Sequence, residues 1–166
     1  MNAIVSAFRP SSGLLTAKRT AAELSEPYST PPIPLFEIAA EQGASIIFAD
    51  FGQHSSVVAG FCDFENAKIY VNNDDIWPRK MFTAAHELGH WVLHRRLFEE
   101  DPQKYAVLPR HQVGKVNSLE QEANAFAAEL LVPRKLLEPV KHAGAVQLAS
   151  IFGVSRQMME IRLKNV

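Results

Sequence analysis

The segment from Phe82 to His94, F-T-A-A-H-E-L-G-H-W-V-L-H, constrains the fold of this 166-residue chain more than any other. On a helix, His86 and His90 lie one turn apart on the same face, so both imidazoles can reach one zinc ion. Glu87 projects about 100° round the helix, where a general base for the attacking water belongs. The apolar residues recur at spacings of three and four, which predicts a helix with one buried face: Phe82, Ala85, Leu88, Val92 and Leu93.

The pattern H-E-x-x-H is short enough to occur by chance on a surface or core helix, so its context matters. Asp74 and Asp75 precede Pro78, and together these residues predict a helix start. The helix should continue to about Phe98. A strand-like run before it and an acidic helix after it favour a metal site over the chance alternative.

A catalytic zinc site needs a third protein ligand. His94 is a poor candidate, because histidines at i, i+4 and i+8 span about 12 Å of helix. Residues 118–133 predict a second helix, on which Glu120 and Asn124 lie one turn apart. Glu120 could bind zinc while the Asn124 amide holds a ligating histidine in its tautomer. Glu122 is the competing carboxylate, but it points about 200° away from Glu120, so we favour Glu120.

The rest of the chain predicts an α+β fold, in which a small, mostly antiparallel sheet packs on the zinc-binding helix pair. Ala123, Ala127 and Ala128 are small enough for the two helices to approach closely. Gly43 marks the end of a helix that begins at Leu35. The predicted elements are a helix over 35–42, strands over 44–51, 57–62 and 67–71, the two helices above, and a helix-turn-helix-like pair over 146–163, with Ser155 capping its second helix.

Two stretches fall outside these elements. Residues 1–34 read as an N-terminal arm with a proline-rich connector, which contains at most a short helix over 16–24 and is most simply a poorly ordered terminus. Residues 35–166 form the predicted metallopeptidase-like domain. Residues 99–117 predict a long polar loop, and its Tyr105, Arg110 and His111 are candidates for contacting substrate or stabilising an oxyanion, although ordinary loop packing is the better explanation of each.

Composition limits the class of protein. With 17 basic and 18 acidic residues the net charge is −1, so nothing global favours nucleic acid or an anionic membrane as a partner. The single cysteine, Cys62, excludes an intramolecular disulfide. No signal peptide or membrane span is evident, so we expect a cytoplasmic protein.

Three segments together resemble the ImmA/IrrE family of zinc metallopeptidases: Phe82 to His94, then E-Q-E-A-N-A-F-A-A-E-L-L-V-P, then L-A-S-I-F-G-V-S-R-Q-M-M-E-I-R-L. The resemblance implies a gluzincin-like fold, zinc held by His86, His90 and Glu120, and Glu87 as catalytic base. We expect a short, single-domain member that departs from the longer radiation-response members of the family, because the sequence ends at Val166 with no room for a C-terminal sensor domain. Characterised members cleave helix-turn-helix repressors, and some belong to toxin-antitoxin-like pairs.

Three functional hypotheses follow. The first is a zinc endopeptidase that cleaves a helix-turn-helix, Xre-like repressor in a stress, mobile-element or toxin-antitoxin-like system. The second is a zinc-containing partner that holds a regulator or toxin without cutting it. The third is a DNA-binding regulator that uses Arg156, Gln157 and Arg162 of the C-terminal helices, which is disfavoured because most of that segment looks like packing.

Overall fold

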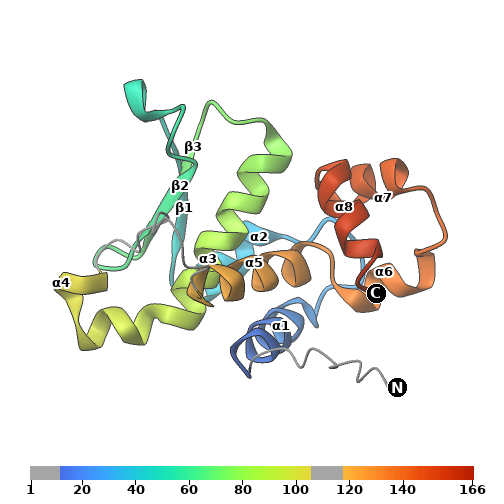
Figure 1. The fold of residues 1–166 in the computed structure, drawn as a ribbon, viewed down its shortest axis with the longest axis horizontal. Helices are drawn as coiled ribbons and strands as arrows, with labels where there is room; N and C mark the ends of the chain where they lie inside the picture. Colours follow the sequence, from blue (N-terminus) through green and yellow to red (C-terminus); the bar gives the residue numbers. More distant parts are fainter. Residues whose placement is uncertain (1–11, 106–117) are drawn as a thin grey trace, which may run out of the picture.

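A computed structural model describes residues 12–105 and 118–166 of the chain (Figure 1). It has the mixed α and β composition that the sequence predicts, with a small three-stranded sheet and several helices. The helices are α1 (Ser12–Ser25), α2 (Leu35–Glu41), α3 (Trp77–Glu100), α4 (Pro102–Tyr105), α5 (Ser118–Leu131), α6 (Arg134–Leu137), α7 (Ala145–Phe152) and α8 (Arg156–Leu163). The strands are β1 (Ser45–Ala49), β2 (Gly60–Asp63) and β3 (Lys68–Asn72), and short 3-10 turns lie at Gly52–His54 and Glu138–Val140.

The sheet has the order β1-β3-β2. β2 and β3 form the expected antiparallel hairpin, in which Cys62 pairs with Ile69. β1 runs parallel to β3, with Phe48 opposite Val71, so the prediction of a mostly antiparallel sheet is wrong for one of its two pairings. The strand patterns specify neither order nor direction, and the connection over residues 50–59 is long enough to bring β1 beside β3 instead of β2.

Helix α3 is the centre of the fold. The sheet lies on one side of it and helices α6 to α8 lie on the other (Figure 1). Pro78 stands in its first turn, as predicted, because a proline there removes no helical hydrogen bond. The expectation of a single buried face is too narrow, since Trp91 is also buried and donates a hydrogen bond from Nε1 to the Gln42 carbonyl oxygen at 2.8 Å. Burial on both sides fixes the rotation of α3 about its axis.

Helices α3 and α5 cross with little space between their backbones. A Cβ atom added at Gly89 would lie 3.0 Å from Phe126 Cδ1 and 3.2 Å from Ala123 Cα. Ala123, Phe126 and Ala127 are fully buried at this crossing. Gly89 and Ala123 therefore permit the close approach that brings side chains from both helices to one point.

Helix α1 packs on α5, so residues 12–25 are an ordered helix and not the poorly ordered terminus that we expected. Its buried residues, Ala17, Ala21 and Ser25, follow a spacing of four. That spacing places all three on one helix face, which is why a segment of low hydrophobicity can still pack. The boundary at residue 34 between an arm and a metallopeptidase-like domain remains a prediction.

The C-terminal helices α7 and α8 meet at a tight turn. Gly153 adopts a positive φ of 71° at the end of α7, which a glycine does without steric cost. The Ser155 side chain accepts a hydrogen bond from the Met158 backbone N–H at 3.1 Å and so caps α8 as predicted. Within residues 12–105 and 118–166, no helix is both long and apolar enough to cross a membrane.

Candidate metal centre

Three side chains converge where α3 crosses α5. His86 Nε2 and His90 Nε2 lie 3.1 Å apart, Glu120 Oε2 lies 3.2 Å from His86 Nε2, and Glu120 Oε1 lies 3.0 Å from His90 Nε2. Two ligands of a tetrahedral zinc ion, each about 2.0 to 2.1 Å from the metal, are separated by about 3.3 Å. The sequence-predicted triad is thus brought together at nearly the separation that a tetrahedral ion requires.

The electrostatics of this cluster favour a cation. Burial lowers the pKa of His90, which disfavours a charged imidazolium there. Burial acts to raise the pKa of Glu120, but the imidazoles of His86 and His90 outweigh it and hold that pKa well below its usual range. Glu120 Oε1 is buried and receives no hydrogen bond of acceptable geometry. A carboxylate that faces the ring nitrogens of two imidazoles is a donor set that fits Zn²⁺.

Asn124 orients the first histidine from α5. Its Oδ1 atom lies 2.9 Å from His86 Nδ1, so the imidazole donates its Nδ1–H to the amide oxygen. That leaves the lone pair of His86 on Nε2, which faces the other two donor atoms. The contact is the one expected from the one-turn spacing of Glu120 and Asn124.

His94 and Glu122 form a contact that the sequence did not predict. His94 is buried, and its two ring nitrogens lie 2.9 Å from His90 Nδ1 and 3.0 Å from Glu122 Oε2. Glu122 is therefore paired with His94 and is separate from the converging side chains of His86, His90 and Glu120. The histidine spacing of four from His86 to His94 was the signal available in the sequence, since it places His94 on the same face of α3 as His90, but it does not identify Glu122 on the other helix as a partner.

Glu87 lies on the same turn of α3 as His86 and is buried, with 3% of its surface exposed. Of the loop candidates, Tyr105 ends α4, and its ring lies under the Lys104 ammonium, with the nitrogen 5.1 Å from the ring centroid. Arg110 and His111 lie outside the residues that the structure describes. Cys62 is buried in β2, and burial with the neighbouring Asp63 raises the pKa of its thiol to about 12, which keeps it protonated.

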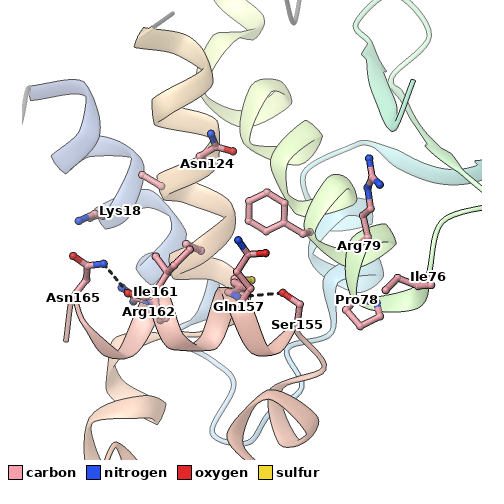
Figure 2. A pocket seen from close by; sticks show the side chains of 14 residues that line it. Lys18, Ile76, Pro78, Arg79, Asn124, Ser155, Gln157, Ile161, Arg162 and Asn165 are labelled. Atoms are coloured by element: carbon pink, nitrogen blue, oxygen red, sulfur yellow. Dashed lines mark hydrogen bonds between the residues drawn. The ribbon is translucent and has the colours of Figure 1, made fainter. Parts of the chain in front are cut away.

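An apolar cleft of about 700 Å³ is lined in part by Asn124, the residue that contacts His86 (Figure 2). Asn124 and Phe82 belong both to its wall and to the surroundings of His86, since the Phe82 and His86 ring centroids are 6.4 Å apart. The remaining wall comes from the start of α3, from α5, from α8 and from Lys18 of α1 (Figure 2). Its apolar lining consists of Ile76, Pro78, Phe82, Ala125, Ala128, Met158 and Ile161.

Two histidines one turn apart on one helix, with a carboxylate from a second helix, are the donor set of the His₂Glu zinc hydrolases. The fold and this cluster define an α+β protein of the H-E-x-x-H class. The chain belongs to the ImmA/IrrE family of metallopeptidases, because the family described as IrrE N-terminal-like domain matches residues 39–164.

A curated relative and a solved structure are also similar to the chain. The metallopeptidase ImmA of Bacillus subtilis (strain 168) is 27% identical over 136 residues, which cover 80% of this chain and 76% of that protein. A solved structure of a Mycobacterium tuberculosis transcriptional regulator superposes with a TM-score of 0.60 at 15% identity. The superposition covers 87% of this chain but only 45% of the regulator, so that likeness concerns the fold alone.

Proposed function

We propose that this protein is a zinc-dependent endopeptidase whose metal is held by His86, His90 and Glu120. The observation that carries the proposal is the convergence of two buried imidazoles and one half-buried carboxylate, in which each pair of side chains approaches to 3.0–3.2 Å and Glu120 Oε1 has no hydrogen-bond partner. Metal ions satisfy such donors, whereas a structural polar cluster satisfies them internally. Membership of a metallopeptidase family supports the same reading.

Each residue of the site has a separate task in this proposal. A bound zinc ion supplies the Lewis acidity that polarises a peptide carbonyl and lowers the pKa of a water molecule. Glu87 takes a proton from the attacking water on a carboxylate oxygen and then gives it to the amine of the leaving peptide. Asn124 holds His86 in the tautomer that keeps the Nε2 lone pair available. Phe82 and the apolar cleft wall exclude bulk water from one side.

The proposed substrate is a protein, and more specifically a helix-turn-helix, Xre-like repressor in a stress, mobile-element or toxin-antitoxin-like system. The repressor rests on the family resemblance, while the apolar cleft beside His86 supports a peptide with apolar side chains. A cytoplasmic location belongs to the same proposal. Direct DNA binding is disfavoured because Arg162 is buried in an ion pair with Glu129 and Arg156 pairs with Glu160 at 2.7 Å.

The test incubates the purified protein with the helix-turn-helix protein encoded nearest its gene, with zinc or with chelator. Wild type and Glu87→Gln are compared, because Gln keeps the size of Glu87 but accepts no proton. We expect zinc-dependent cleavage that falls by at least about 100-fold in Glu87→Gln, with zinc content unchanged. Cleavage at the wild-type rate by Glu87→Gln would remove Glu87 from the mechanism.

The same incubation, together with a DNA-binding assay, separates the two alternative functions. A stable complex without cleavage, indifferent to Glu87→Gln, would replace the peptidase with a zinc-containing partner that sequesters a regulator or toxin. A salt-sensitive mobility shift of promoter DNA, lost in Arg156→Ala, would instead favour a DNA-binding regulator.

A further inference from the structure

The contact between His94 and Glu122 has no task in the proposed mechanism, yet it is built from buried polar groups in direct reach of a proposed ligand. His94 is 3% exposed and lies one helical turn beyond His90 on α3. Its Nδ1 atom faces His90 Nδ1 at 2.9 Å, and its Nε2 atom faces Glu122 Oε2 at 3.0 Å. Buried polar groups are costly, so two buried histidines joined to the half-buried Glu122 call for a reason.

The protons in this chain follow from the donors available. An ionised carboxylate only accepts hydrogen bonds, so the contact with Glu122 requires a proton on His94 Nε2. A neutral His94 then carries its lone pair on Nδ1, and His90 must donate its own Nδ1–H. The lone pair of His90 is thereby left on Nε2, the atom that faces His86 and Glu120.

We propose that His94 and Glu122 are positioning residues, which act through His90 and fix its tautomer and ring orientation for the metal. The inference rests on the metal site of the proposed function. Helix α5 thus orients both ligating histidines: Asn124 contacts His86 directly, and Glu122 reaches His90 through His94.

Helix α1 supports the outer end of this chain. Gly13 packs so tightly against Glu122 that a Cβ atom at residue 13 would collide with Glu122 Oε1. A side chain at this position would push the carboxylate away from its present place. Gly13 lies outside the residues matched by the family, so this support comes from a part of the chain that the match does not cover.

Two substitutions at His94 separate positioning from packing. Asn places its Oδ1 atom two bonds from Cβ, as His places Nδ1, so His94→Asn keeps an acceptor for His90. Gln places its amide nitrogen three bonds from Cβ, as His places Nε2, so His94→Gln keeps a donor for Glu122 and loses the acceptor. Both variants lose the ring, which makes them matched for packing.

Zinc affinity is measured by competition with a chromophoric chelator, alongside the melting temperature of the metal-free proteins. We expect affinity to fall about 10- to 100-fold in His94→Gln and in Glu122→Ala, and only a few-fold in His94→Asn and Gly13→Ala. Gln121→Ala, at an exposed neighbour on α5, is the control and should match wild type. The Co²⁺ absorption bands should shift in His94→Gln, since a reoriented imidazole changes the ligand field.

Equal affinities in His94→Gln, His94→Asn and wild type would overturn the positioning role, as would weaker binding in His94→Asn than in His94→Gln. Long-range ¹H–¹⁵N spectra of the zinc-loaded protein should show His94 protonated on Nε2 and bare on Nδ1, and the opposite tautomer would also overturn it. A wild-type protein that binds no zinc would refute the proposed metal site itself, which keeps the two failures distinct.

Discussion

Helix α5 carries a buried polar cluster at each end, and the two clusters are satisfied in different ways. At its start, Glu120 faces two imidazole nitrogens, and its Oε1 atom receives no hydrogen bond. At its end, Glu129 forms an ion pair with Arg162 of α8, and both residues are 7% exposed. Each cluster joins α5 to a helix that is distant in the sequence.

The cluster at the end of α5 is complete without a ligand. Glu129 Oε2 contacts Arg162 Nη2, and Glu129 Oε1 accepts a hydrogen bond from the Arg134 backbone N–H at 2.9 Å. Arg162 Nε donates to the Val132 carbonyl oxygen at 3.0 Å. Both Glu129 oxygens have a donor here, whereas at the start of α5 the buried Glu120 Oε1 atom has none. The contrast separates a structural ion pair from a cluster that calls for a cation.

The largest effect should come from removing the carboxylate that faces the imidazoles. Glu120→Ala should reduce bound zinc from about one ion per chain to nearly none, because only two protein ligands remain. Glu122→Ala is the comparison, since it removes a carboxylate two residues away; it should bind zinc more weakly than wild type but still hold about one ion per chain at micromolar metal. Elemental analysis after dialysis gives the stoichiometry. If Glu122→Ala loses zinc and Glu120→Ala keeps it, then Glu122 is the ligand and Glu120 is not.

A smaller effect, on stability alone, is expected at the other end of α5. Arg162→Met should lower the free energy of unfolding by about 3 to 5 kcal/mol, because it leaves the buried Glu129 carboxylate without its partner. Adding Glu129→Gln should restore much of that loss, since it removes the charge but keeps an acceptor for the Arg134 N–H. Denaturant unfolding measures both, and zinc binding should stay unchanged. Loss of zinc in Arg162→Met would mean that the two clusters are coupled.

The smallest effect should come from the crossing that assembles the metal cluster. Gly89→Ala should lower the free energy of unfolding by about 1 to 3 kcal/mol, because its Cβ would press on Phe126 and on the Ala123 backbone. Gly144→Ala is a control, as a Cβ there meets nothing within 4 Å. Thermal unfolding of the metal-free Gly89→Ala, Gly144→Ala and wild-type proteins measures the difference in stability. An unchanged stability in Gly89→Ala would show that α3 and α5 have room to separate.

The sequence predicted those features of the site that depend on local spacing. His86 and His90 meet because a helix repeats every 3.6 residues, and Asn124 follows Glu120 by one turn for the same reason. Alanine at residues 123 and 127 correctly indicated a close helix pair, as both are fully buried. The start of α3 and the hairpin of β2 and β3 likewise follow from short-range signals.

Features that depend on long-range packing were not predictable in the same way. Helix geometry correctly separates Glu120 from Glu122 on α5. It does not indicate where His94 lies on α3 relative to either carboxylate. The parallel pairing of β1 with β3 depends on the path of the intervening connection. The packing of α1 rests on Ala17 and Ala21, whose small side chains give only a weak hydrophobic pattern.

The contact of Gly13 with Glu122 bears on where the folding unit begins. The family match begins at residue 39, so it leaves out helix α1. A cooperative folding unit, in contrast, includes every segment that packs into the shared buried core. A truncated protein that begins at residue 39 would expose the α5 surface that α1 covers. It would also lose the hydrogen bond that Lys135 Nζ donates to the Glu26 carbonyl oxygen at 2.6 Å. Helix α1 is thus part of the packing that buries α5, and we expect a protein that begins at residue 39 to unfold at a lower temperature than the full chain.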